Sequence, residues 1–172
     1  MNLKWAMILW VLLGIVIVGA AAVISHFFVF GKANPPLVKN EVRINGAIFE
    51  VEIASTTMEK ARGLSFRASL GAGEGMLFLF DTPSIQSFWM KDMNFPIDMI
   101  WIGAGKNGDG KSGYEVLGFA QNAVPQLGVP LWNLTIYNSP DGTDKVLEVN
   151  AGTVAKDNIK VGDAVQIGPL GG

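Results

Sequence analysis

An uncharged hydrophobic run at the N-terminus dominates the pattern of apolar and polar positions, and it extends over residues 5–31 between Lys4 and Lys32. About 20 apolar residues cross the hydrocarbon core of a bilayer, so the run is long enough to span it with some tilt. Its aromatic residues lie toward the two ends, as in segments anchored at both membrane interfaces: Trp5, Trp10, Phe27, Phe28 and Phe30. The pattern predicts a single-pass transmembrane anchor over residues 5–30.

Two other interpretations of this run stay open. One is a cleavable signal peptide that ends at the small residues 19–22, and the other is a buried core helix. The hydrophobic region of a cleavable signal usually has ~7–15 residues, whereas this run continues apolar to Phe30. A short N-terminus before a long C-terminal part favours a domain outside the cytoplasm, so we expect a cell-membrane protein with an extracytoplasmic domain.

The segment after the run contains Asn34-Pro35-Pro36, which is typical of a stiff, extended linker. We therefore assign residues 31–40 to a linker that lifts a domain off the membrane. The domain is expected over residues 41–168, and residues 169–172 form a C-terminal tail.

Alternation of apolar and polar residues indicates strands after the linker. Residues 42–44 and 47–53 flank Asn45-Gly46, which is the strongest short-range signal for a β-hairpin. In the second arm Phe49, Val51 and Ile53 alternate with acidic residues, so one face of the strand is buried and the other is wet.

Further apolar runs predict strands at 76–80, 88–90, 97–102, 114–124, 131–137, 145–149 and 164–167. Thr56 and Glu59 have the spacing of a capping box and predict a short helix through about Leu64. Residues 153–158 predict a second helical turn. The fold class is therefore mostly β: a single compact antiparallel domain, either a sandwich or a partly open barrel, with one or two short helices.

Composition limits the chemistry that this domain can perform. The chain has no cysteine, which excludes disulfides, thiol nucleophiles and cysteine-ligated metals. Its one histidine, His26, lies in the apolar run, so a Ser-His-Asp triad or a histidine-ligated metal is excluded from the domain. We expect no metal and no cofactor. From Ala33 onward 11 Lys and Arg residues are scattered among 15 Asp and Glu residues, which makes nucleic acid a poor candidate partner.

Several linked motifs resemble one known family. They are Ala61-Arg62-Gly63-Leu64-Ser65-Phe66-Arg67, Glu74-Gly75-Met76-Leu77-Phe78-Leu79-Phe80, Ser87-Phe88-Trp89-Met90-Lys91, Pro96-Ile97-Asp98-Met99-Ile100, Val146-Leu147-Glu148 and Ile159-Lys160-Val161-Gly162-Asp163. Their order and spacing over residues 42–167 are similar to those of the domain-of-unknown-function 192 (DUF192) family. The resemblance implies a small, mostly-β domain, often exported or membrane-tethered, without an established activity.

The chain departs from this family pattern at three places. Ser65 stands where the family usually has methionine, and Asp92-Met93 stands where it usually has Asn-Thr. Residues 105–113 indicate an enlarged loop. If the polar residue after Trp89-Met90-Lys91 belongs to a site, Asp92 changes the charge of that site.

The candidate polar cluster consists of Arg62, Arg67, Glu74, Lys91 and Asp98. The two arginines could clamp a ligand carboxylate or phosphate, or they could brace the loop before residue 76. Asp98 lies among apolar residues and shares a strand face with Ile100 and Ile102, so burying it requires a partner. We expect a buried salt bridge from Asp98 to Arg62 or Arg67, with a role as a site acid as the alternative.

Phe88 and Trp89 form a candidate aromatic platform for a sugar or an apolar ligand, with Lys91 at its rim. Packing of one of the two rings in the core is the structural alternative. Glu74 and Asp98 could form the carboxylate pair of a glycosidase, although no spacing rule links them. A Ser87–Lys91 hydrolase pair is disfavoured, because four residues of strand separate its members by ~13 Å.

Taken together, these features favour a membrane-anchored, non-catalytic binding or accessory module of the cell envelope, without catalytic residues. Its partners would be the lipid bilayer, through residues 5–30, and an envelope ligand or protein. The alternative function is a small envelope hydrolase that uses a carboxylate as acid or base, with Asp98, Glu74 and Arg62 as its working residues.

Overall fold

The computed structural model describes residues 32–106, 110 and 112–168. The predicted anchor at 5–30 and the tail at 169–172 lie outside the described residues. Within the described part of the chain, no helix has the length and apolar character needed to cross a bilayer.

The N-terminal hairpin has the predicted form. Strands β1 (Lys39–Ile44) and β2 (Ala47–Ala54) pair in antiparallel fashion, with Ile44 opposite Ala47. The two turn residues Asn45 and Gly46 have φ angles of 48° and 82°. Tight turns with both central residues at positive φ match the twist of the flanking strands, and Asn-Gly adopts them at little cost.

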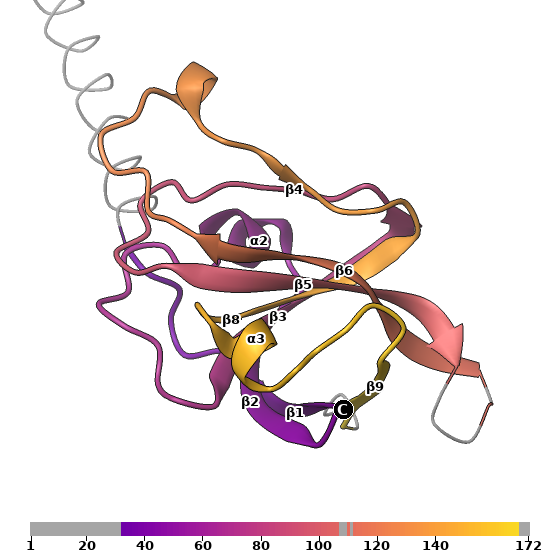
Figure 1. Cartoon of the computed structure of the whole chain (residues 1–172). Coiled ribbons are helices and arrows are strands. Elements are labelled where there is room, and N and C mark those ends of the chain that lie inside the picture. The colour runs from indigo at the N-terminus through magenta and orange to yellow at the C-terminus, as the bar shows by residue number, and fades with distance from the viewer. Residues whose placement is uncertain (1–31, 107–109, 111, 169–172) are drawn as a thin grey trace, which may run out of the picture. The chain divides into compact units, whose positions relative to one another are not determined.

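Seven strands of the described chain close into a barrel in the order β1-β2-β3-β8-β5-β6-β9, as Figure 1 shows. Its other members are β3 (Glu74–Ser84), β5 (Ile97–Lys106), β6 (Ser112–Ala123), β8 (Thr143–Asn150) and β9 (Ala164–Ile167). Pairing of β1 with β9 closes the barrel, while β2 and β3 run parallel. The mostly-β prediction is thus confirmed, and the architecture is a closed barrel rather than a sandwich or a partly open barrel.

Two short helices accompany the barrel. Helix α2 (Thr57–Arg62) lies in the crossover that joins the parallel strands β2 and β3, and it begins with the predicted capping box of Thr56 and Glu59. In this box the Glu59 amide donates to Thr56 Oγ1, and the Glu59 carboxylate accepts from the Thr56 amide at 2.9 Å. Helix α3 (Thr153–Lys156) follows β8 and confirms the second helical turn.

The apolar residues form two layers. The barrel interior contains a cluster that includes Val42, Leu77, Ile100 and Leu147. A second cluster includes Leu64, Met76, Met99 and Val146, which makes it the outer face of the same strands. Strand β5 supplies both clusters, because successive side chains of a strand point to opposite faces of the sheet.

The outer layer is covered by long connections rather than by further sheet. Two short strands, β4 (Ser87–Phe88) and β7 (Tyr137–Asn138), pair with each other in these connections. The predicted strand at 88–90 extends too far, because β4 ends at Phe88. Met90 is buried, and the chain turns at Asp92, whose φ is 57°. Aspartate and asparagine tolerate this conformation better than most residues do, which is consistent with Asp at this position.

The predicted strand at 131–137 is wrong over most of its length. Leu131–Asn133 forms the 3-10 helix η1. Of the predicted segment, only the last residue, Tyr137, lies in a strand. The large side chains of Leu131, Trp132 and Ile136 are exposed, so no apolar face of this segment packs on the core as a strand would. An apolar run therefore does not make a strand here.

The predicted linker docks on the domain from Asn34 onward. The buried Asn34 side chain donates to the carbonyl oxygens of Glu59 and Gly63, both at 3.0 Å, at the end of α2. Leu37 packs against the outer layer, and its amide donates to Glu52 Oε2. These contacts hold Asn34 and Leu37, both within the predicted linker 31–40, against the barrel.

Candidate functional site

The five residues of the candidate polar cluster do not meet in one site. Arg67 forms an ion pair with Glu52, Lys91 pairs with the neighbouring Asp92, and Glu74 accepts from the Gly71 amide at 3.0 Å. Glu74 is exposed at the start of β3.

The expected salt bridge from Asp98 to Arg62 or Arg67 is wrong. The Asp98 carboxylate is fully buried and accepts from two backbone amides, those of Asn122 at 2.8 Å and Val154 at 2.9 Å. None of the ion pairs found among the described residues joins it to an arginine. A buried acid needs a partner, and here the partner is the backbone, which no side-chain pattern reveals.

Arg67 and Glu52 make the best-formed ion pair in this region. The Arg67 Nη1 and Nη2 atoms lie 2.6 and 2.8 Å from the two Glu52 oxygens, and each side chain is 17% exposed. Hydrogen bonding to Arg67 is the main cause that lowers the pKa of Glu52 below its usual value. The pair joins β2 to the loop after α2, so Arg67 braces that loop.

Replacing Arg67 with methionine is expected to lower the free energy of unfolding by about 1–3 kcal/mol, because Glu52 loses a bidentate, largely shielded partner. The stabilisation is present above the unfolded-state pKa of Glu52 and is lost as the pH falls through the lowered folded-state value. Urea unfolding of the wild type and the variant from pH 7 to pH 3 measures this. Equal stability of the two proteins at pH 7 would contradict the role of the pair.

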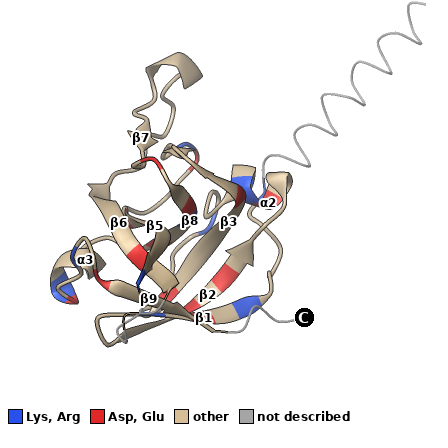
Figure 2. Cartoon of the chain, turned by 90° about the vertical axis from the view of Figure 1, so that its right-hand side faces the viewer, with Lys and Arg blue, Asp and Glu red and all other residues tan. Residues whose placement is uncertain are grey.

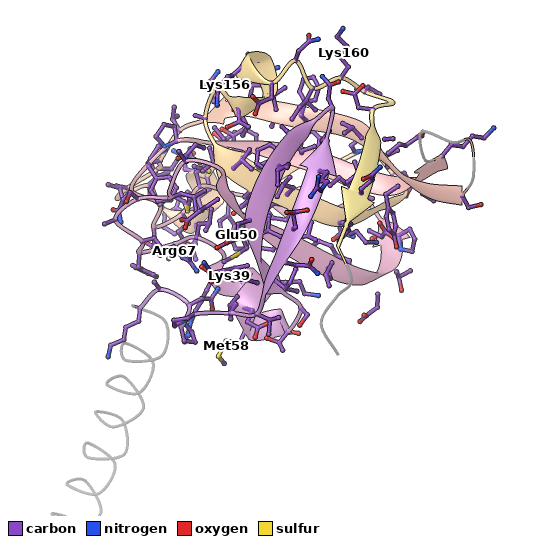
Figure 3. All side chains as sticks on the ribbon, turned by 90° about the horizontal axis from the view of Figure 1, so that it is seen from below. Lys39, Glu50, Met58, Arg67, Lys156 and Lys160 are labelled. Carbon is purple, nitrogen blue, oxygen red and sulfur yellow. The ribbon has the colours of Figure 1, made fainter. Side chains whose placement is uncertain are left out.

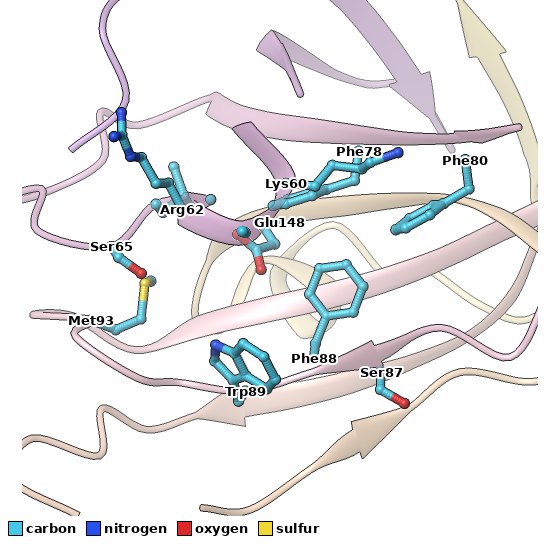
Figure 4. Close-up of a pocket in the computed structure, with 13 residues that line it drawn as sticks. Lys60, Arg62, Ser65, Phe78, Phe80, Ser87, Phe88, Trp89, Met93 and Glu148 are labelled. Carbon is cyan, nitrogen blue, oxygen red and sulfur yellow. The ribbon is translucent and has the colours of Figure 1, made fainter. Parts of the chain in front are cut away.

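A cavity of about 190 Å³ opens in the outer layer beside α2 (Figure 4). Three segments supply most of its lining: the end of α2 and its following loop, the middle of β3, and β4 with the residue after it. Met93, together with Glu148 of β8, completes the lining. Segments distant in sequence thus converge on one concave surface.

Aromatic rings form much of the cavity wall. Phe88 makes edge-to-face contacts with Phe78 and Phe80, with ring centroids 5.1 and 6.3 Å apart. Trp89 is 46% exposed. Lys60 Nζ lies 4.8 Å from the centroid of the Phe80 ring and donates to the Leu79 carbonyl. Both members of the candidate platform, Phe88 and Trp89, therefore line the cavity, with Lys60 rather than Lys91 beside them.

Glu148 is the unusual residue of this cavity. It lies opposite Met76 on β3 and Met99 on β5, so its side chain belongs to the apolar outer layer. It is 4% exposed, and its Oε2 atom has no hydrogen-bond partner among the described residues. Burial raises the pKa of Glu148 to about 8, against a weaker opposing effect of the Arg67 charge. The group is therefore a neutral carboxylic acid at pH 7, able to donate and to accept a hydrogen bond.

Gly63 provides close access to this acid. Its φ of 51° and its position favour glycine, because an added Cβ would lie 3.1 Å from Phe78 Cζ and 3.8 Å from Glu148 Oε2. A side chain there would crowd the ring and cover the carboxyl group.

Two departures from the family pattern, Ser65 and Met93, also line the cavity. Ser65 Oγ donates to the Lys91 carbonyl at 3.0 Å, which fixes the wall formed by residues 63–65. Arg62 lines the cavity as well, and its guanidinium points away from Glu148 in Figure 4.

Glu148 is the site residue that the sequence analysis missed. The sequence does indicate this residue, because Glu148 is an acid within the apolar strand 146–149, just as Asp98 is an acid among apolar residues. Only the partners differ, because Asp98 accepts from two amides and Glu148 Oε2 has none. Among the described residues, no three His, Asp or Glu side chains converge as metal ligands would.

Comparisons with known proteins identify a family and two similar solved structures, without an established activity. The family model for DUF192, described as an uncharacterised ACR, matches residues 40–167. A protein of unknown function from Novosphingobium aromaticivorans DSM 12444 has 34% identity and a TM-score of 0.65, and the match covers 78% of this chain and 91% of that one. A protein proposed to be a transcription regulator, from Sinorhizobium meliloti 1021, has 27% identity, a TM-score of 0.65 and coverages of 78% and 98%. No curated protein matches significantly.

Proposed function

The chain belongs to the DUF192 family, and from this premise and the geometry of the cavity we propose that it is a membrane-anchored, extracytoplasmic binding module of the cell envelope. The cavity around Glu148 is its ligand site. The observation that carries the proposal is a buried acid, without a partner on one oxygen, at the wall of an aromatic cavity. A buried polar group without a partner is costly, so a ligand that supplies one gains affinity from it.

The cavity indicates the class of ligand. At about 190 Å³ it is smaller than the ~300–1,000 Å³ pockets of drug-sized ligands, so it accommodates one ring or one side chain at a time. Its wall offers aromatic faces for an apolar surface, and Glu148 offers one hydrogen-bonding group. A sugar ring has an apolar face and a hydrogen-bonding edge, so we propose a single ring of an envelope glycan as the bound group.

A hydrolase remains the second candidate, and one observation favours it. Glu148 is protonated at pH 7 and could act as a general acid. Glycoside hydrolysis usually requires a second carboxylate ~5–9.5 Å away, and Glu148 is the one carboxyl among the lining residues of this cavity. Asp98 contributes to the barrel interior, and Glu74 is not part of the lining. The geometry therefore supports binding better than hydrolysis.

The charge distribution argues against nucleic acid as a partner. Figure 2 shows Lys and Arg interspersed with Asp and Glu over the described barrel, without a continuous basic stripe. Phosphate backbones bind to clustered cations, and their binding weakens strongly with salt. We therefore do not propose a role in transcription for this chain, although the similar protein from Sinorhizobium meliloti is proposed to be a transcription regulator.

Two exposed tryptophans allow a matched test of the cavity. We expect soluble peptidoglycan fragments to bind the purified full-length chain, and Trp89→Ala to weaken that binding at least tenfold, because Trp89 lines the cavity. Trp132→Ala is the control, since Trp132 is 87% exposed and lies outside the lining. Titration calorimetry measures both affinities.

Equal losses in the two tryptophan variants, or no binding by the wild type, would contradict the proposed site. Glu148→Gln keeps the size and the neutral state of the side chain, so it is expected to retain the fold and to alter binding. Release of shorter glycan products by the wild type, abolished by Glu148→Gln, would favour the hydrolase instead.

A further inference from the structure

A second surface of the domain is apolar and exposed. It lies in the connection between β6 and β7, residues 124–136, and five of its large apolar side chains are between 46% and 87% exposed: Val124, Leu127, Leu131, Trp132 and Ile136. Trp132 at 87% is the most exposed large hydrophobic residue described. Isolated exposed apolar residues are ordinary, but five of them within 13 residues mark an interaction surface.

This apolar loop, residues 124–136, contains no charged residue, and the next ones along the chain are Glu115 and Asp141. Protein-binding surfaces usually carry a polar rim around their apolar core, whereas an uncharged loop that carries an exposed tryptophan suits the boundary of a bilayer. The loop is also ordered by its own contacts. Gln126 joins its two legs, donating to Thr135 Oγ1 at 3.1 Å and accepting from the Thr135 amide at 3.0 Å. Its shape therefore does not depend on a partner.

The apolar loop leaves the barrel beside the point at which the described chain begins. Gln126 donates from its amide to the Met90 carbonyl, and Ser65 donates to the Lys91 carbonyl next to it. Two residues before Ser65, the Gly63 carbonyl accepts from Asn34. In Figure 1 both the loop and the indigo start of the described chain lie on the upper left of the domain.

The docking of Asn34 sets the distance to the membrane. If the anchor ends at Phe30, three residues separate it from Asn34, which is fixed to the domain, and the four Cα–Cα steps between the two reach no more than about 14 Å. The domain then lies against the lipid with this end, and the apolar loop is on that end. A linker without contacts to the domain would not hold this end of the domain near the membrane.

We infer that the apolar loop 124–136 inserts into the interfacial region of the bilayer that holds the anchor, and so fixes the orientation of the domain on the membrane. The inference rests on the anchor of the proposed function and is independent of the ligand. Trp132 and Leu131 lie among the lipid headgroups and upper acyl chains, where an amphipathic indole is favoured.

The absence of cysteine from the chain provides a clean experiment. Leu131→Cys and Val161→Cys each introduce one thiol at a position of equal exposure, 64% and 63% in the parent protein. Val161 adjoins Lys160, which lies at the opposite edge of the barrel from Met58 of α2 in Figure 3. Each full-length variant is labelled with an environment-sensitive fluorophore and reconstituted into vesicles of phosphatidylethanolamine and phosphatidylglycerol, with and without doxyl-labelled lipid.

Doxyl lipid is expected to quench the label at position 131 at least twofold and to leave the label at position 161 unchanged. Because the loop is uncharged, the quenching should also persist in phosphatidylcholine vesicles and at 0.5 M salt. A label at position 131 that is as accessible to water as the one at 161 would overturn the inference. Protection that appears in detergent and grows with protein concentration would do so too, because it indicates a second copy of the chain.

Sedimentation of the same vesicles after an alkaline wash tests the anchor separately. Protein in the pellet with an unquenched label at 131 would overturn the loop insertion and leave the anchor standing. Protein lost from the pellet would overturn both, and glycan binding in detergent would still report on the cavity by itself.

Discussion

Replacing Asp98 with alanine is expected to destabilise the domain by about 2–5 kcal/mol. The carboxylate accepts from the amides of Asn122 and Val154, so its removal leaves two donors without acceptors inside the protein. Each unsatisfied buried donor costs roughly 1–3 kcal/mol. The effect is large because these contacts join the end of β6 to the start of α3.

Urea unfolding at pH 7 measures this loss, with Asp163→Ala as a matched control. Asp163 also accepts from a backbone amide, that of Lys160 at 2.8 Å, but in an exposed turn. Its replacement should cost less than about 1 kcal/mol, because water can satisfy the freed amide. Asp98→Asn should fall between the two, since one of its side-chain atoms can still accept while the other presents a donor to an amide.

Ligand binding separates a structural role of Asp98 from a functional one. Asp98 belongs to the barrel interior and not to the cavity lining, so the folded fraction of Asp98→Asn should bind glycan like the wild type. Unchanged stability together with abolished binding would contradict this assignment and would support the alternative of a site acid.

The features that could be predicted from the sequence are those set by neighbouring residues. The Asn45-Gly46 turn, the Thr56–Glu59 capping box and the strand periods all depend on contacts within a few positions. The strand parity that put Asp98 on the same face as Ile100 and Ile102 is also local, and the two isoleucines do lie in the barrel interior.

The features that could not be predicted depend on distant contacts. Closure of the barrel requires β1 to pair with β9, more than 120 residues later, and no local pattern encodes that choice. The same holds for Asp98, which accepts hydrogen bonds from backbone amides 24 and 56 positions away. Backbone donors have no sequence code, whereas arginines are visible in a sequence, and for this reason the prediction of an arginine partner for Asp98 was wrong.

The candidate site contains residues that could be predicted from the sequence and one that was not. The aromatic pair was found because adjacent aromatic residues are visible in a sequence, and both members line the cavity. Glu148 was missed because its environment consists of β3, β5 and the loop after α2, which meet only in the folded barrel. Its acidity within an apolar strand was the available clue.

Lowering the pH from 9 to 5 is expected to stabilise the wild type relative to Glu148→Gln by on the order of 4–5 kcal/mol. In the folded protein Glu148 holds its proton up to about pH 8, whereas the ordinary pKa of 4.5 applies in the unfolded chain. Between these values unfolding releases one proton. The free energy of unfolding therefore falls by ~1.4 kcal/mol for each unit of rising pH and is constant above the folded-state pKa.

Urea unfolding of both proteins at each pH from 5 to 9 measures the difference between their free energies of unfolding. Groups that titrate alike in both proteins do not contribute to this difference. Glu148→Gln should match the wild type near pH 5, where both side chains are neutral, and exceed it at pH 9, where only the wild type buries a charge. A Glu148→Gln curve that runs parallel to the wild type would mean that the carboxyl group is ionised in the folded protein, and the cavity would then present an anion rather than a neutral acid to its ligand.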